Sequence, residues 1–236
     1  MTENQSLPSF DIGDHFNVLT RTISQNLRLF ALIAVVAAAC NVGASLAFGG
    51  ASFAYGLISS IVYVLLGPVA IMSAYDAHLG RTLRTGDYFN ISIRLFFYAL
   101  IVLVVQALLI SVGLFLLIVP GLYVAAMLYV TLPALVIERQ GFSAFGRSLE
   151  LSKGYRWPIV LVALVVFLLM MMVAFVWDLL VGISQLSGLP IVGPALEAFS
   201  SAFLVLIPTI SSALVYWRLV EHKEGRSLTD IADVFA

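Results

Sequence analysis

The segment LFFYALIVLVVQALLISVGLFLLIVPGLYVAAMLYVTLPALVI, from Leu95 to Ile137, contains no charged residue. The whole chain has 236 residues, of which 61% are hydrophobic and 11% are charged, and its mean hydropathy is +1.06. Soluble domains carry about 25% charged residues. A membrane-crossing helix needs roughly 20 mainly apolar residues, whereas a membrane β-barrel has short segments of alternating hydrophobicity. Because the apolar runs here are continuous, the sequence predicts an all-α integral membrane protein.

The apolar runs predict six transmembrane helices. A helix satisfies every backbone N–H and C=O group within its own segment, which the hydrocarbon core of a bilayer requires. The connections between the runs alternate between uncharged and charge-rich segments. The predicted spans are residues 28–48, 53–75, 94–116, 119–138, 158–180 and 196–219.

The distribution of basic residues predicts the orientation. With six spans, all twelve Lys and Arg residues lie on or at the edge of one side of the membrane, and an odd number of spans would break this segregation. The other side carries only the acids Asp178 and Glu197. Positive residues are retained in the cytoplasm. We therefore expect both termini to be cytoplasmic.

The pentapeptides GDHFN, residues 13–17, and GDYFN, residues 86–90, each precede an apolar run. Apolar residues follow at helical spacing and basic residues share the segments, as is typical of short amphipathic helices in the membrane interface. GFSAFGRSLELSKGYRWP, residues 141–158, is a third such segment. Asp14 and Asp87 would satisfy free N–H groups at a helix start, and the glycines would suit the turn before it. We interpret the pentapeptides as helix-start signals, with a chance match and a ligand-binding motif as the alternatives.

Prolines add a second periodic feature. The second, fourth and sixth predicted spans contain Pro68, Pro133 and Pro208, and proline inside a helix removes a hydrogen bond and kinks it. The order of interfacial helix, span, tight turn and proline-bearing span thus occurs three times, which indicates three hairpin repeats. We expect one transmembrane domain over residues 1–236. Its repeat-like units are about 10–80, 81–140 and 141–220, and a cytoplasmic tail is expected over 221–236.

The stretch GLFLLIVPGLYVAAMLYVTLPALVIERQGFSAFGRSLELSKGYRW, residues 113–157, resembles the signature of a bacterial inner-membrane family of unknown function. That family includes the membrane domain fused to some glycerophosphoryl diester phosphodiesterases and distant Yip-type proteins. The matching motifs are VPG at 119–121, PALVIE at 133–138 and RSLELSKGYRW at 147–157. The tail YWRLVEHKEG, residues 216–225, is similar but places Arg218 before Leu219 instead of after it. The resemblance implies a six-span bundle in the bacterial inner membrane and no established activity.

Motifs for chemistry are not evident. His15, His78 and His222 stand alone, without a second ligand at helical spacing. The sequence has no Walker loop, no H-E-x-x-H motif and no G-x-S-x-G motif. The net charge of −1 gives no global basic patch for nucleic acid. We therefore expect a protein that is not an enzyme, with no cofactor, no metal site and no nucleic-acid partner. Cys40, the single cysteine, is interpreted as an apolar-face residue.

Polar groups at bilayer depth would mark a transport path. The candidates are few, and Asp178 and Glu197 near the span ends are interpreted as interfacial carboxylates. A transporter should gather such groups around a polar cavity, and a scaffold should not. The candidates are Asn41, Gln106, Ser111, Thr131, Thr209, Ser211 and Ser212.

The segment FGRSLELSKGYRW, residues 145–157, supplies the candidate site. Arg147, Lys153, Arg156 and Trp157 are candidate contacts for lipid headgroups, particularly anionic ones. The alternatives are snorkelling cations in an aromatic belt and a pair between Arg147 and Glu150 on one helix face. We expect a scaffold or lipid-organising protein of the inner membrane that binds lipids and either a membrane-protein partner or a second copy. The alternative is a small transporter or lipid-handling channel.

Overall fold

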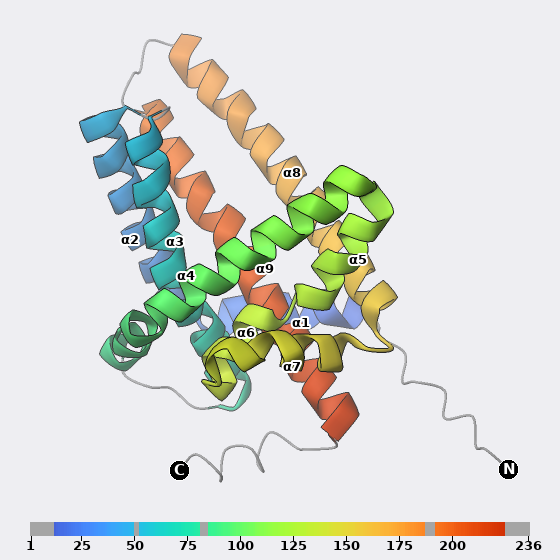
Figure 1. Ribbon diagram of the computed structural model, residues 1–236. Coiled ribbons are helices and arrows are strands. Elements are labelled where there is room, and N and C mark those ends of the chain that lie inside the picture. Colours follow the sequence, from blue (N-terminus) through green and yellow to red (C-terminus); the bar gives the residue numbers. More distant parts are fainter. Residues whose placement is uncertain (1–11, 50–51, 81–84, 187–191, 225–236) are drawn as a thin grey trace, which may run out of the picture.

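The computed structural model describes residues 12–49, 52–80, 85–186 and 192–224, and within these ranges the side chains of residues 12, 78, 184–186, 192–202, 204 and 205 are not described. The described chain is helical and contains no strand, which confirms the all-α prediction. Figure 1 shows the arrangement of the helices. They are α1 Ile12–Gln25, α2 Leu27–Phe48, α3 Phe53–His78, α4 Thr85–Leu116, α5 Ile118–Leu128, α6 Thr131–Glu138, the short 3-10 helix η1 Gly141–Ser143, α7 Ala144–Ser152, α8 Arg156–Leu186 and α9 Val192–Glu224.

Five candidate membrane spans are found in the described residues, by length and composition. They correspond to α2, most of α3, α4, α5 together with α6, and most of α8. The outer faces of these helices expose large apolar side chains, such as Phe97 at 72% and Phe175 at 71%. A surface of this kind is stable in hydrocarbon and not in water. By helix length and hydropathy, the chain is a multi-span membrane protein. The sixth predicted span, residues 196–219, lies within α9, and many of its side chains are outside the described set.

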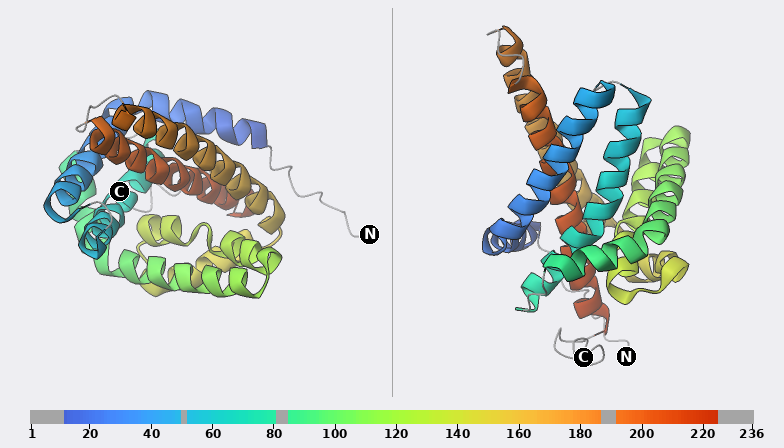
Figure 2. Two further views of the ribbon diagram at one scale, coloured as in Figure 1. Left: turned by 90° about the horizontal axis from the view of Figure 1, so that it is seen from above. Right: turned by 90° about the vertical axis from the view of Figure 1, so that its left-hand side faces the viewer.

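The long helices pair as the hairpins α2–α3, α4–α5 and α8–α9, with α9 also packed against α2 and α3. Figure 1 and the right-hand view of Figure 2 show α1 and α7 lying across one end of these hairpins, at a steep angle to α9. This end also holds the start of α4, the start of α8 and the end of α9. The described basic residues belong to these segments, to the start of α2 and to the chain between α6 and α8, and Asp178 lies far along α8 from them. The charge segregation expected from the sequence is therefore present, and two of the expected interfacial helices are separate elements.

Both pentapeptides lie at helix starts. Asp14 is in the first turn of α1 and Asp87 is in the first turn of α4, as predicted. The glycines before them are inside the helices, so the prediction that they form the preceding turn is wrong. The prediction of a separate second interfacial helix is also wrong. α4 continues without interruption from Thr85 to Leu116, because nothing between the pentapeptide and the apolar run breaks a helix, whereas the chain turns at Asn26 between α1 and α2.

The fourth predicted span is divided into α5 and α6. The division falls at Tyr129 and Val130, and Tyr129 is four residues before Pro133, where the proline ring clashes with the carbonyl group and the N–H donor is missing. Two neighbouring carbonyl groups are satisfied by side chains from other helices. Gln106 Nε2 of α4 donates to the Leu128 carbonyl at 3.1 Å, and the Ser148 hydroxyl of α7 donates to the Met127 carbonyl at 2.8 Å. Side chains of α4 and α7 thus supply hydrogen-bond donors to carbonyl groups beside the break.

The α4–α5 hairpin turns at Leu117 and is closed by two glycines. A Cβ atom on Gly113 would lie 2.9 Å from the Gly121 Cα atom, and one on Gly121 would lie 2.6 Å from the Leu114 backbone nitrogen. Only glycine lets the two backbones approach this closely. The turn is exposed and apolar, with Phe115 at 92% exposure. In Figure 1 and in the right-hand view of Figure 2, it ends short of the adjoining ends of α2 and α3.

The buried apolar residues form two clusters that meet on α9. One cluster joins α1, α2 and α3 to Leu206, Ile210, Ala213 and Leu214 of α9. The other joins α4, α5, α6, α7 and α8 to residues of α9, which are Val215, Tyr216, Leu219 and Val220. Consecutive turns of α9 therefore serve different halves of the bundle.

Candidate lipid-interface site

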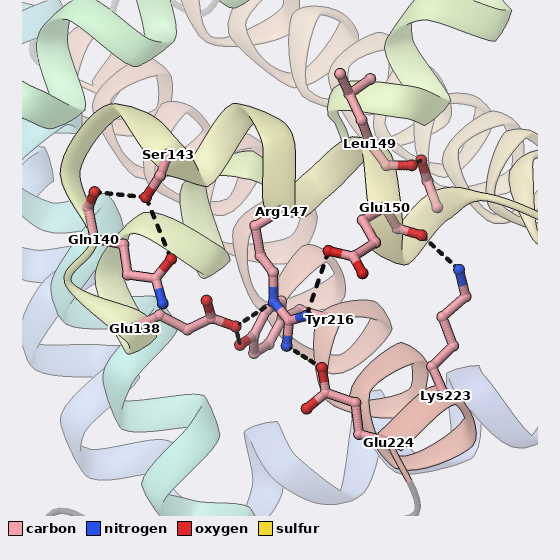
Figure 3. A network of polar contacts seen from close by, with 10 residues as sticks. Glu138, Gln140, Ser143, Arg147, Leu149, Glu150, Tyr216, Lys223 and Glu224 are labelled. Carbon is pink, nitrogen blue, oxygen red and sulfur yellow. Dashed lines mark hydrogen bonds and ion pairs between the residues drawn. The ribbon is translucent and has the colours of Figure 1, made fainter.

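Arg147 is the centre of an ion-pair network that joins three helices. Its Nε atom lies 2.7 Å from Glu138 Oε1 of α6, and its Nη2 atom pairs with Glu224 Oε1 of α9. Figure 3 shows the guanidinium group between these two carboxylates. The side chains of Arg147, Glu138 and Glu224 are exposed by 19%, 16% and 21%. The arrangement holds α7 against α6 and the end of α9.

Two further contacts fix α9 to the same network (Figure 3). The Tyr216 hydroxyl donates to Glu138 Oε1 at 2.6 Å, and Lys223 Nζ donates to the backbone carbonyl of Glu150. Burial lowers the pKa of Arg147, but the hydrogen bonds and charges of Glu138 and Glu224 outweigh burial and raise that pKa above its ordinary value. The guanidinium group is therefore charged and engaged by carboxylates on two neighbouring helices.

The local pair considered in the sequence analysis is the longest contact in this network. Arg147 Nη1 lies 4.0 Å from Glu150 Oε2, and the Glu150 side chain is 75% exposed. An exposed pair of this length contributes ~0–1 kcal/mol. The main partners of Arg147 lie nine residues earlier and in the last described turn of α9. Neither could be identified from helical spacing.

Lys153, Arg156 and Trp157 lie together at the junction of α7 and α8. Lys153 is exposed and follows the last residue of α7, and Gly154 turns the chain with a φ of +91°. Trp157 is 62% exposed in the first turn of α8. We call Lys153, Arg156 and Trp157 the α8 edge. Arg147 is not part of it, because its guanidinium group contacts α6 and α9.

Arg156 is held in place by Tyr123 of α5. Its guanidinium carbon lies 5.0 Å from the centre of the Tyr123 ring, and Nη1 donates to the Tyr123 hydroxyl. Next to it, the buried Tyr155 ring stacks on His222 of α9 with 6.1 Å between ring centres. Burial raises the pKa of Tyr155. The α8 edge thus presents cations and an aromatic ring, and contacts with α5 and α9 hold it in place.

A buried polar cluster that the sequence did not indicate links α1 to α9. His15 Nε2 lies 2.9 Å from the Ser211 hydroxyl oxygen, which also accepts a hydrogen bond from Tyr129 at 3.3 Å. Asp14 pairs with Arg218, about two turns nearer the end of α9. Burial, followed by the charge of Arg218, lowers the pKa of His15 to about 4, so His15 is neutral at pH 7.

The His15–Ser211 distance is within the range of a base and a nucleophile. Both side chains are 0% exposed, however, and a nucleophile needs room for the reacting atom of a substrate beside it. The geometry instead suits a structural polar contact, which we call the latch, that fixes α1 to α9. Because the two residues are 196 positions apart, this contact could not be predicted from the sequence.

Three of the polar groups considered for transport, Asn41, Gln106 and Thr209, lie in separate places. Asn41 accepts a hydrogen bond from Ser59 at 2.7 Å and donates to the Tyr63 hydroxyl at 3.4 Å, which ties α2 to α3. Gln106 caps α5 as described above. Thr209 lines a cavity of about 10 Å³ between α2, α3 and α9, which is about the space of one water molecule.

The remaining candidate residues do not gather into a site in the part of the chain that the structure describes. No group of three His, Cys, Asp or Glu residues there could hold a metal ion. Cys40 and Asp178 are exposed on α2 and α8. The side chains of Glu197 and His78 lie outside the described residues, as do residues 225–236 of the predicted tail.

Comparison of the chain with models of protein families, with curated proteins and with solved structures finds no match.

Proposed function

We propose that the chain is a non-enzymatic scaffold or lipid-organising protein of the bacterial inner membrane, with the end that carries α1 and α7 on the cytoplasmic side. The observation that carries this proposal is the α8 edge. There Lys153 and Trp157 are exposed beside the supported Arg156, at the point where the apolar outer face of α8 begins. Cations attract anionic headgroups, and tryptophan favours the same depth in the membrane.

The contacts that the other polar groups make within the bundle support this proposal. Asn41 and Gln106 make hydrogen bonds between helices, and Arg147 is paired with carboxylates of α6 and α9. These groups hold the bundle together, whereas the α8 edge combines an exposed cation with an exposed tryptophan. The resemblance to the inner-membrane family described above agrees with this proposal and remains part of it.

The alternative, a small transporter or lipid-handling channel, has one observation in its favour. This is an apolar cavity of about 280 Å³ beside α2 and α9. It opens on the lipid-facing side of the bundle and its lining is apolar, so it suits a hydrocarbon chain better than a polar solute.

Native mass spectrometry of the protein in nanodiscs of mixed phosphatidylglycerol and phosphatidylcholine tests the proposal. The wild-type protein should retain phosphatidylglycerol preferentially, and Lys153→Gln should weaken that retention about fivefold, the effect of one cation near an anionic surface. Arg94→Gln is the matched control, because Arg94 is an exposed cation at the same end of the bundle, on α4. A protein that retains neither lipid preferentially and copurifies with no stoichiometric partner would contradict the proposal.

A further inference from the structure

An apolar groove lies between the start of α2 and the middle of α9. Its volume is about 280 Å³, roughly twice that of the ~150 Å³ apolar cavity known to bind benzene. Phe30, Ala34, Leu206 and Ile210 form a buried wall, whereas Leu27 and Val35 at its rim are 61% and 56% exposed. The groove is therefore open toward the lipid. Its lining also includes Ile23, Ala31, Phe203 and Ile207.

The groove begins at the interfacial end of the bundle. Ile23 belongs to α1, and Leu27 is the first residue of α2, so one end of the groove meets the turn between these helices. α1 packs against both α2 and α9 there and lies across the end of the bundle (Figure 2). A molecule in the groove would thus have one end at headgroup depth and the other within the hydrocarbon layer.

Arg28 gives this end of the groove a positive charge. It is exposed, and it lies three residues before Ala31 and seven before Val35, which places it on the edge of the same face of α2. The residues that line the groove contribute no charge of their own. A hydrocarbon-shaped groove with a cation at its interfacial end is complementary to a lipid with an anionic headgroup.

We propose that this groove binds one acyl chain of an anionic phospholipid, with the headgroup beside Arg28. The inference rests on the proposed lipid-organising function but uses a surface different from the α8 edge. Hydrocarbon in the groove exchanges with hydrocarbon of the bilayer, so apolar burial supplies little net affinity. The headgroup charge therefore determines which lipid occupies the site, and the shape of the groove determines where its chain lies.

Photo-crosslinking in nanodiscs tests the inference with phosphatidylglycerol that carries a diazirine in one acyl chain. Labelling should concentrate on residues 27–35 and 203–210. Ala31→Phe fills the groove from its exposed rim and should abolish this labelling, whereas Ala107→Phe, at an exposed position on α4, should leave it unchanged. Arg28→Gln, a surface change that keeps the fold, should reduce labelling about fivefold, and Arg94→Gln should not.

Each other outcome overturns the inference. Even labelling of the outer faces of α4 and α8, equal labelling by the phosphatidylcholine probe, or labelling that Ala31→Phe does not change would each refute the site. A dimer mass that Ala31→Phe abolishes, with no lipid crosslink in the groove, would assign the groove to a second copy of the chain. Lys153→Gln should leave groove labelling intact, so failure of the α8 edge and failure of the groove are separate results.

Discussion

Replacing Arg147 by glutamine should lower the stability of the bundle without lowering its retention of anionic lipid. The change removes the cation between Glu138 and Glu224, whose side chains are only 16% and 21% exposed. Removing one member of a fully buried pair costs ~3–5 kcal/mol, and an exposed pair contributes ~0–1 kcal/mol. With the partial exposure of this network, we expect a loss of about 2–3 kcal/mol, because two carboxylates are left close together.

Thermal unfolding in nanodiscs measures this loss. For a chain of this size, a loss of 2–3 kcal/mol corresponds to a decrease in Tm of roughly 5–10 °C. Lys153→Gln is the matched control, since Lys153 is exposed at the end of α7, and it should show the opposite pattern, an unchanged Tm and weaker retention of phosphatidylglycerol. Adding Glu138→Gln to Arg147→Gln should restore part of the stability. An unchanged Tm for Arg147→Gln together with lost lipid would refute the assignment of Arg147 to the network.

Three further predictions test how the helices are joined. Gly121→Ala should destabilise the α4–α5 hairpin by ~1–3 kcal/mol, because its Cβ atom would lie 2.6 Å from a backbone nitrogen; in thermal unfolding, Gly43→Ala should be harmless, as nothing lies within 4 Å of that Cβ position. Because the pKa of His15 is lower in the folded chain than in the unfolded chain, the unfolded chain binds a proton at a higher pH. The stability present above pH ~6.5 should therefore fall by about 3 kcal/mol as the pH decreases to about 4. The difference in stability between the wild type and His15→Asn should follow this interval, and parallel pH profiles would contradict the latch. Gln106→Leu leaves the Leu128 carbonyl without its donor and should cost ~1–2 kcal/mol in unfolding by denaturant, and no loss would show that the α5–α6 break needs no cap.

The local features of the fold follow from the sequence. Apolar runs indicated the five candidate spans found in the described residues, and Asp14 and Asp87 lie in the first turns of helices as predicted. Pro133 indicated a distortion in the fourth span, and the break falls four residues before it, where its ring meets the carbonyl group. The continuous α4 was missed because an amphipathic segment and an apolar span join without a break when no residue between them disfavours a helix.

The candidate site could be predicted only in part, because its contacts join distant segments. Lys153, Arg156 and Trp157 are neighbours in sequence and lie together at the start of α8. Arg147 belongs to the same segment, but its position on α7 directs it to α6 and α9. Helical spacing suggested Glu150 as its partner. The closer partners are Glu138 of α6 and Glu224, and the place of Glu224 depends on how α9 returns to the cluster. A single sequence contains no signal for that return.

α9 explains why the first expected repeat is not complete by itself. The sequence pattern associates every interfacial helix with the hairpin that follows it, but α1 is fixed to α9 by His15 with Ser211 and by Asp14 with Arg218. α7, by contrast, is fixed to α9 of the hairpin that follows it, through Arg147 and Glu224. The last helix therefore sets the position of both α1 and α7 and supplies one wall of the apolar groove. Since α9 contributes to both buried clusters as well, a change that shifts α9 should disturb the two interfacial helices together, even though they lie in the first and third repeat-like units.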